Sequence, residues 1–214
     1  MQLAECPNCN TKYKSSMFTT VEQLPQDQIN IINAFNENKV ISYCTKCGSD
    51  LYGDSRVKMV EEQRVLQTEL QTLIKSIPVV SLQNPLNWDY EVIEMVTGQS
   101  TTGTGIVSEL TSSFTDLFGL QSSRYNNKLK AGEDLCFAQL RKRTIEVGGN
   151  AVIATDIDYS EVGGEKGMLM VCMAGTAVKL KNIEILGIDK IDPLNKIPGV
   201  YTRLSYLNSL GNTA

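Results

Sequence analysis

Two close pairs of cysteines are the residues whose types and spacing most directly imply chemistry. Cys6 and Cys9 form the pair CPNC, and Cys44 and Cys47 form the pair CTKC. A gap of two residues lets both thiolates of a pair bind one ion, and two pairs complete the tetrahedral four-cysteine site typical of structural Zn²⁺. Gly48, directly after the second pair, suits the positive φ that such a turn often needs.

Four thiolates fill the coordination sphere of the ion and leave no position for a substrate or an activated water. We therefore expect one structural zinc per chain, in a zinc-ribbon-like domain over residues 1–56 that folds only with its metal. The long segment between the pairs predicts an inserted helix near Pro25 to Asn36. A redox CxxC and ordinary core cysteines are the alternatives, although a thioredoxin-type site needs a single pair at the start of a helix.

Composition excludes several classes of protein. Of the 214 residues, 42% are hydrophobic and 21% are charged, as in a folded soluble protein. The net charge of −4 argues against a protein built to hold nucleic acid or anionic membrane. No apolar run approaches the roughly 20 residues of a membrane span. The N-terminus lacks the regions of a signal peptide, and the cysteine spacing fits a reducing compartment, so we expect a cytoplasmic protein.

The sequence contains no histidine. The commonest general base and the commonest transition-metal ligand are therefore missing. A Ser-His-Asp or Cys-His site is impossible within one chain, and any metal site must use Cys, Asp, Glu or backbone groups. We assign no catalytic residue and favour a protein that is not an enzyme.

Residues 57–77 form the strongest predicted helix, because they are rich in good helix formers and contain neither Gly nor Pro. Alternating steps of four and three residues relate a heptad-like seam with one polar member: Met59, Gln63, Leu66, Leu70, Leu73 and Ile77. This connector helix either packs on its own domain or meets its copies in an oligomer.

Residues 78–181 predict an α+β domain. We expect strands over 78–82 and 89–96, a short helix over 106–120, a long helix over 124–147, and a hairpin around a turn at Gly163–Gly164. That order places a small, largely antiparallel sheet under the long helix. Residues 182–214 form a C-terminal extension, in which 183–188 suits a last strand and 201–210 an amphipathic helix.

Several separated motifs give this domain a family resemblance. They are, in chain order, Val96-Thr97-Gly98, Ser123-Arg124-Tyr125, Gly149-Asn150-Ala151-Val152-Ile153, Asp156-Ile157-Asp158-Tyr159, Met168-Leu169-Met170-Val171 and Gly175-Thr176-Ala177-Val178. Over Pro78 to Leu180 the sequence resembles the YbjQ-like family, small bacterial proteins often labelled heavy-metal-binding. The resemblance implies a dodecin-like α+β subunit that assembles into a ring, with a pentamer favoured and sheet edges paired between neighbours. It implies no established reaction.

Three hairpin residues could bind a second metal. Met168, Met170 and Cys172 fall on one face of a strand, and thioether and thiolate ligands suit Cu(I) or another soft ion. A packed core is the commoner reason for such residues, because Met and free Cys are ordinary core fillers. The intervening apolar residues face the other way, so we expect the strand to be buried on both sides.

Asp156 and Asp158 share a face of the other hairpin strand. They could hold a hard cation or act in acid-base chemistry. More often such a pair forms a solvated strand face or an intersubunit contact. With Tyr159 and Arg124 they are the candidate residues of a ligand site between subunits.

Three functional hypotheses follow. The first is a non-enzymatic, ring-forming zinc protein that acts as a scaffold or as a binder of a small ligand or metal. Its zinc ribbon or C-terminal extension could recruit a protein partner. The second is an enzyme or small-molecule sensor whose site lies between subunits. The third is a zinc-ribbon nucleic-acid binder, which we disfavour because acidic residues offset the lysines of the ribbon.

Overall fold

The computed structural model describes residues 3–15, 20–102, 120–162 and 168–211, so the expected helix over 106–120 and the turn at Gly163–Gly164 lie outside the described residues. The chain forms two compact units. Unit 1 consists of Met1–Leu70 and Gly199–Ala214, and unit 2 consists of Gln71–Pro198.

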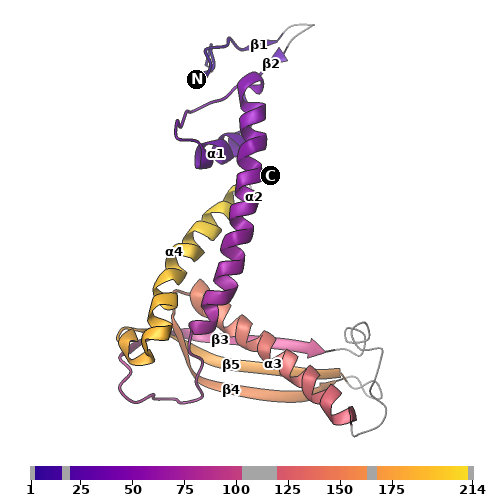
Figure 1. Ribbon diagram of the computed structural model, residues 1–214, viewed down its shortest axis with the longest axis vertical. Coiled ribbons are helices and arrows are strands. Elements are labelled where there is room, and N and C mark those ends of the chain that lie inside the picture. The colour runs from indigo at the N-terminus through magenta and orange to yellow at the C-terminus, as the bar shows by residue number, and fades with distance from the viewer. Residues whose placement is uncertain (1–2, 16–19, 103–119, 163–167, 212–214) are drawn as a thin grey trace. The chain divides into compact units, whose positions relative to one another are not determined.

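The elements are, in chain order, β1 (Lys14–Ser15), β2 (Thr20–Val21), α1 (Gln26–Phe35), α2 (Thr45–Leu73), η1 (Ile74–Ser76), β3 (Tyr90–Thr102), α3 (Leu120–Glu146), β4 (Ala151–Val162), β5 (Met168–Leu180), η3 (Ile183–Leu186) and α4 (Ile188–Gly211). Figure 1 labels the α-helices and the strands. The expected α+β class is therefore confirmed. The helix expected over 201–210 is the second half of α4.

Unit 2 is built on a three-stranded antiparallel sheet in the order β3-β5-β4. Helix α3 packs across one face of this sheet, as Figure 1 shows. The core between them consists of Val96, Cys136, Leu140, Val152, Val171, Met173 and Ala177. The expected sheet under a long helix is therefore present, and alternate residues of β5 supply its centre.

Helix α3 approaches β3 most closely at Gly98. A Cβ atom at this position would lie 2.5 Å from the carbonyl oxygen of Cys136, closer than packed atoms can approach. Only glycine lets the helix backbone and the strand backbone touch here. The Val96-Thr97-Gly98 motif is therefore explained by packing, because Val96 is buried in the same core.

The side chain of Gln139 on α3 occupies part of the outer edge of β3. Its Oε1 accepts a hydrogen bond from the backbone N–H of Gln99 (2.8 Å), and its Nε2 donates to the backbone oxygen of Gln99 (3.1 Å). One side-chain amide thus makes both bonds that a neighbouring strand would make at this residue.

Residues 78–82 run beside β4 without forming a full strand. Val79 bridges Val152 in parallel orientation. The N–H of Val80 donates to the oxygen of Val152 (2.9 Å), and the N–H of Val152 donates to the oxygen of Pro78 (2.9 Å). The predicted strand is thus a short extended segment that covers the first residues of the β4 edge.

The expected strand over 183–188 is wrong. Ile183–Leu186 form the 3-10 turn η3, and Gly187 follows with a φ of 90° before α4 begins. The physical reason is that β5 is the central strand and already pairs on both edges. Leu180 pairs with Tyr90, the first residue of β3, and Val178 pairs with Ala151, the first residue of β4, so the chain beyond Leu180 has no strand residues left to pair with.

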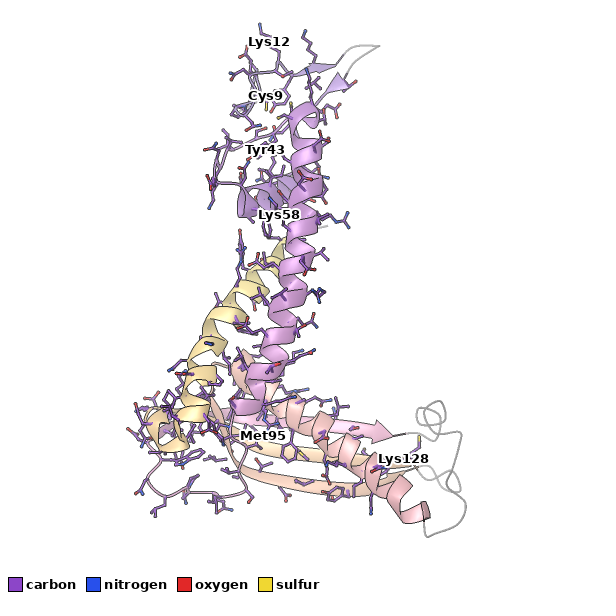
Figure 2. The ribbon with its side chains drawn as sticks, in the orientation of Figure 1. Cys9, Lys12, Tyr43, Lys58, Met95 and Lys128 are labelled. Carbon is purple, nitrogen blue, oxygen red and sulfur yellow. The ribbon has the colours of Figure 1, made fainter. Side chains whose placement is uncertain are left out.

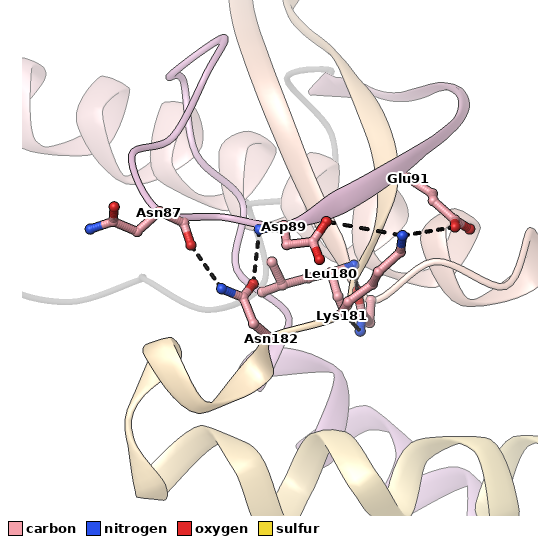
Figure 3. A network of polar contacts seen from close by, with 7 residues as sticks. Asn87, Asp89, Glu91, Leu180, Lys181 and Asn182 are labelled. Atoms are coloured by element: carbon pink, nitrogen blue, oxygen red, sulfur yellow. Dashed lines mark hydrogen bonds and ion pairs between the residues drawn. The ribbon is translucent and has the colours of Figure 1, made fainter.

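Polar contacts fix the exit from β5, as Figure 3 shows. The side-chain amide of Asn182 donates to the oxygen of Asn87 (2.8 Å) and accepts a hydrogen bond from the N–H of Asp89 (2.9 Å). Lys181 forms ion pairs with Glu91 (3.0 Å) and Asp89 (4.0 Å). These contacts tie the start of β3 to the end of β5.

Unit 1 contains the inserted helix that the sequence predicted, now α1. Residues 57–73 of the predicted connector helix belong to a longer helix, α2, which begins at Thr45 and ends at Leu73. The last predicted residues are not α-helical, because Ile74–Ser76 form η1 and Ile77 is extended. A Cβ at Gly48 would collide with the side chains of Leu24 and Tyr43. The glycine that resembled a turn signal is therefore a close-packed helix residue.

Part of the heptad-like seam packs inside unit 1. Met59 shares an apolar cluster with Leu207 and Leu210 of α4. The polar member, Gln63, donates a hydrogen bond to the side-chain oxygen of Asn208 (2.9 Å). These seam positions therefore have their partners within the chain.

Candidate metal centre

The four paired cysteines converge on one point of unit 1. Their Sγ atoms all lie within 4.8 Å of one another. Three of the separations are 3.7 Å for Cys6 and Cys47, 3.6 Å for Cys9 and Cys44, and 3.6 Å for Cys44 and Cys47. A regular tetrahedron with Zn–S bonds of about 2.3 Å has S–S edges of about 3.8 Å, so the sulfurs of this four-cysteine cluster are spaced for a four-coordinate ion.

The first pair lies in a tight loop that the backbone closes. The N–H of Asn10 donates to the oxygen of Cys6 (2.8 Å), and the N–H of Cys6 donates to the oxygen of Thr11 (2.8 Å). Asn10 has a φ of 56°, in the left-handed region that asparagine tolerates better than most residues. The positive φ expected at Gly48, after the second pair, belongs instead to Asn10, which follows the first pair and was not predicted.

The second pair lies at the start of α2. Cys44 directly precedes the helix, and Cys47 lies in its first turn. The N–H of Gly48 donates to the oxygen of Cys44 (2.8 Å), so Gly48 is helical and its expected positive φ is wrong. The N-terminus of a helix carries free N–H groups and partial positive charge, which favour thiolates.

Further donors face the sulfurs. The N–H of Cys44 donates to Sγ of Cys6 (3.3 Å), and the side-chain amide of Asn8 donates to Sγ of Cys47 (3.4 Å). Cys9, labelled in Figure 2, is an exposed residue, and its Sγ lies 3.2 Å from the hydroxyl of Thr11. Hydrogen bonds of this kind fix ligand orientation at a metal site.

The pKa values of Cys6 and Cys9 are lowered, whereas the pKa of Cys47 is raised. Hydrogen bonds from the side chain and backbone of Thr11 lower the pKa of Cys9 to about 6. Burial opposes ionisation of Cys6, but backbone N–H groups outweigh it and lower the pKa of that thiol. Burial and the neighbouring sulfurs raise the pKa of Cys47 to about 12. A bound cation would favour the deprotonated form that cysteine ligands need.

The candidate soft-metal residues occupy one face of β5. Met168, Met170 and Cys172 are half-buried, whereas the residues between them are buried against α3. The expectation that β5 is buried on both sides is therefore wrong for this stretch. Among the described residues, the four-cysteine cluster is the one group of His, Cys, Asp or Glu side chains spaced for a metal.

The candidate carboxylates lie on the same side of the sheet as Cys172. Asp158 is the direct cross-strand partner of Cys172, and Asp156 is the partner of Ala174. Both carboxylates are exposed. The structure thus places Asp156, Asp158 and Cys172 near one another on an open face, without enclosing them.

Tyr159 and Arg124 do not join this group in the described structure. Tyr159 points to the α3 side of the sheet, where its hydroxyl donates to Oε1 of Glu133 (2.9 Å). That contact with a carboxylate raises the pKa of the phenol. Arg124 lies in α3, and its side chain is outside the described part of the structure.

Comparison with known proteins identifies the family that unit 2 matches. A family model named YbjQ_1 and described as "Putative heavy-metal-binding" matches residues 83–181. A UPF0145 protein of Actinobacillus pleuropneumoniae is 34% identical over 87 residues, which are 41% of this chain and 82% of that protein. The chain belongs to the YbjQ-like family. A UPF0145 protein of Bacillus cereus is 36% identical over 90 residues, 42% of this chain and 85% of that protein.

The YbjQ-like match leaves out all four ligand candidates, because it begins after α2. The heavy-metal description therefore concerns a region without the four-cysteine cluster. A crystal structure of a DUF74-family protein with unknown function from Pediococcus pentosaceus is 18% identical, with a TM-score of 0.37 over 49% of this chain and 98% of that chain. In the part of the chain that the structure describes, no helix is long and apolar enough to cross a membrane.

Proposed function

We propose that the protein is a non-enzymatic, cytoplasmic zinc protein whose YbjQ-like unit assembles into a ring and serves as a scaffold or small-ligand binder. The observation that carries the zinc assignment is the tetrahedral spacing of four sulfurs from two CxxC pairs. A full set of thiolate ligands leaves no open position, so the ion is structural. Reduced thiols also fit a cytoplasmic location.

The edges of the sheet support assembly. Both β3 and β4 are edge strands of a three-stranded sheet, and β3 carries exposed apolar side chains near its start. Val92 is 65% exposed and Met95 is 71% exposed. The uncovered stretches of these edges, with apolar side chains on β3, favour pairing with another chain. Pairing β3 of one copy with β4 of the next is a head-to-tail contact, which closes into a ring when the rotation permits.

Native mass spectrometry of the untreated protein, with elemental analysis, tests both parts of this proposal. We expect one zinc per chain and a closed oligomer, with a pentamer favoured. Iron in place of zinc would overturn the metal assignment, because tetrahedral thiolate sites also take iron. A monomer would overturn the ring.

A matched pair of variants separates the two parts. Met95→Asp places a charge on the β3 edge and is expected to abolish the oligomer while zinc stays at one per chain. Ile41→Asp changes an equally exposed apolar residue of unit 1, 72% exposed, and is expected to leave the oligomer intact. Equal effects of the two variants would contradict the assignment of the β3 edge.

A further inference from the structure

The short helix α1 is held between two separate apolar clusters of unit 1. One side packs through Ile29 and Ile32 against Leu24 and Tyr43. The other side packs through Ile31 into the cluster that contains Leu207 of α4. A helix of ten residues is marginal on its own in water, so α1 depends on both clusters.

The first cluster is connected directly to the metal ligands. Tyr43 is fully buried and is the residue before Cys44 (Figure 2). Its backbone oxygen accepts a hydrogen bond from the N–H of Leu24 (2.9 Å), and its hydroxyl donates to the side-chain oxygen of Asn33 on α1 (3.0 Å). An ion that fixes Cys44 therefore also fixes the side chain on which α1 rests.

The second cluster holds the C-terminal segment, residues 199–211. The guanidinium of Arg203 makes two hydrogen bonds to the Glu62 carboxylate on α2, of 2.7 and 2.8 Å. It also lies 5.6 Å from the ring centroid of Phe35, the last residue of α1. Leu207 is fully buried in the cluster. This segment therefore docks on both α1 and α2.

We propose that metal binding at the four-cysteine cluster controls the docking of residues 199–211 on α1 and α2. This inference rests on the proposed metal site. When the ion leaves, Cys44 and Tyr43 lose their fixed position, α1 loses one of its two supports, and the C-terminal segment is released. Release exposes the apolar residues Leu207 and Leu210 together with Met59, which they cover in the docked state.

Hydrogen exchange on the full-length chain tests the coupling. Exchange of residues 199–211 is measured by mass spectrometry with zinc bound, after removal of the metal by a chelator, and after zinc is added back. We expect exchange in this segment to accelerate at least about tenfold on metal removal and to recover with zinc. Exchange in β5, the centre of unit 2, is expected to stay unchanged.

The outcomes distinguish the coupling from the metal site itself. If elemental analysis finds no metal, the proposed function fails. If zinc binds but exchange in residues 199–211 does not respond to its removal, the coupling is overturned while the metal site stands. If β5 accelerates equally, the metal stabilises the whole chain and the local coupling is overturned.

Reciprocity gives a second test, because coupling between two sites must act in both directions. Leu207→Ala undoes the docking without touching a ligand, and is expected to weaken zinc retention at least about fivefold in competition with a chromophoric chelator. Ile188→Ala truncates an apolar residue of the same helix that is 83% exposed, and is expected to retain zinc as the wild type does. Equal zinc retention by both variants would also overturn the coupling.

Discussion

Units 1 and 2 differ in how they are stabilised. Unit 2 has three long hydrogen-bonded strands, a long helix and one continuous core. Unit 1 has two strands of two residues, the ten-residue helix α1, most of α2, the second half of α4 and two small apolar clusters, one of which includes Cys47 of the four-cysteine cluster. Unit 2 therefore has one continuous core to fold around, whereas unit 1 has smaller clusters that the proposed ion would cross-link.

The family resemblance explains residues that maintain the fold of unit 2, but not the cysteines of unit 1. In unit 2, the motif residue Asn150 bonds through its side chain to the N–H and oxygen of Leu180, at 2.6 and 2.9 Å. Gly98 permits contact between α3 and β3. These motif residues maintain the subunit fold and do not converge on a reacting centre. The residues with recognisable metal chemistry lie in unit 1, outside the family match.

Removing one of the cysteine ligands is expected to give the largest difference in stability between the two units. Cys44→Ser removes a buried ligand at the start of α2, and structural zinc contributes on the order of 10 kcal/mol to the folding of small domains. We expect loss of the zinc and of hydrogen-exchange protection throughout unit 1, with the unfolding transition of unit 2 retained. The control is Cys172→Ser, a thiol outside the cluster, which is expected to keep the zinc. Retained zinc in Cys44→Ser would contradict the site.

A substitution at the helix–strand contact tests the other unit. Gly98→Ala places a Cβ 2.5 Å from a backbone oxygen that cannot move independently of α3. We expect the free energy of unfolding of unit 2 to fall by about 2–4 kcal/mol in urea titrations, with zinc content unchanged. A loss of zinc in this variant would show that the two units are not independently stabilised.

The ion pair between Glu62 and Arg203 is expected to make the stability of unit 1, but not of unit 2, depend on pH. Hydrogen bonding to Arg203 lowers the pKa of Glu62 from its usual value of 4.5. Its contribution to stability is therefore complete above that value and is lost only as the pH falls below it. We expect Glu62→Gln to destabilise unit 1 by about 1 kcal/mol, by the same amount at every pH between 5 and 7. A difference that did not shrink as the pH was lowered further, through 4.5 and below, would contradict the lowered pKa.

The smallest expected effect is a gain in the stability of unit 1. Gly53 lies inside α2, and a Cβ there would meet no atom within 4 Å. Alanine costs less backbone entropy than glycine in a helix, so Gly53→Ala should raise the stability of unit 1 by up to about 1 kcal/mol. Thermal unfolding of the zinc-bound protein measures this. Destabilisation would indicate that the exposed side of α2 at this position has a partner.

The metal cluster was predictable because ligand spacing is a local property of the sequence. The hairpin and the long helix of unit 2 were predictable for a similar reason, since their apolar periods are long. The start of α2 was not predictable from the sequence, because Gly48 resembles a turn residue unless its contact with Tyr43 is known. The 3-10 turn after β5 depends on how the strands pair, which the segment Ile183–Leu186 does not encode by itself. The ring stays a prediction.

The amide of Gln139 on the β3 edge has a consequence for aggregation. An open strand edge can grow into stacked sheets, and growth needs every outward-facing backbone group along the edge. With Gln99 already occupied by an internal side chain, a foreign strand can align only with the part of β3 before it unless it displaces that amide. Gln139 thus limits strand pairing to the part of β3 before Gln99. This permits a short and specific contact with another chain and disfavours fibrillar growth.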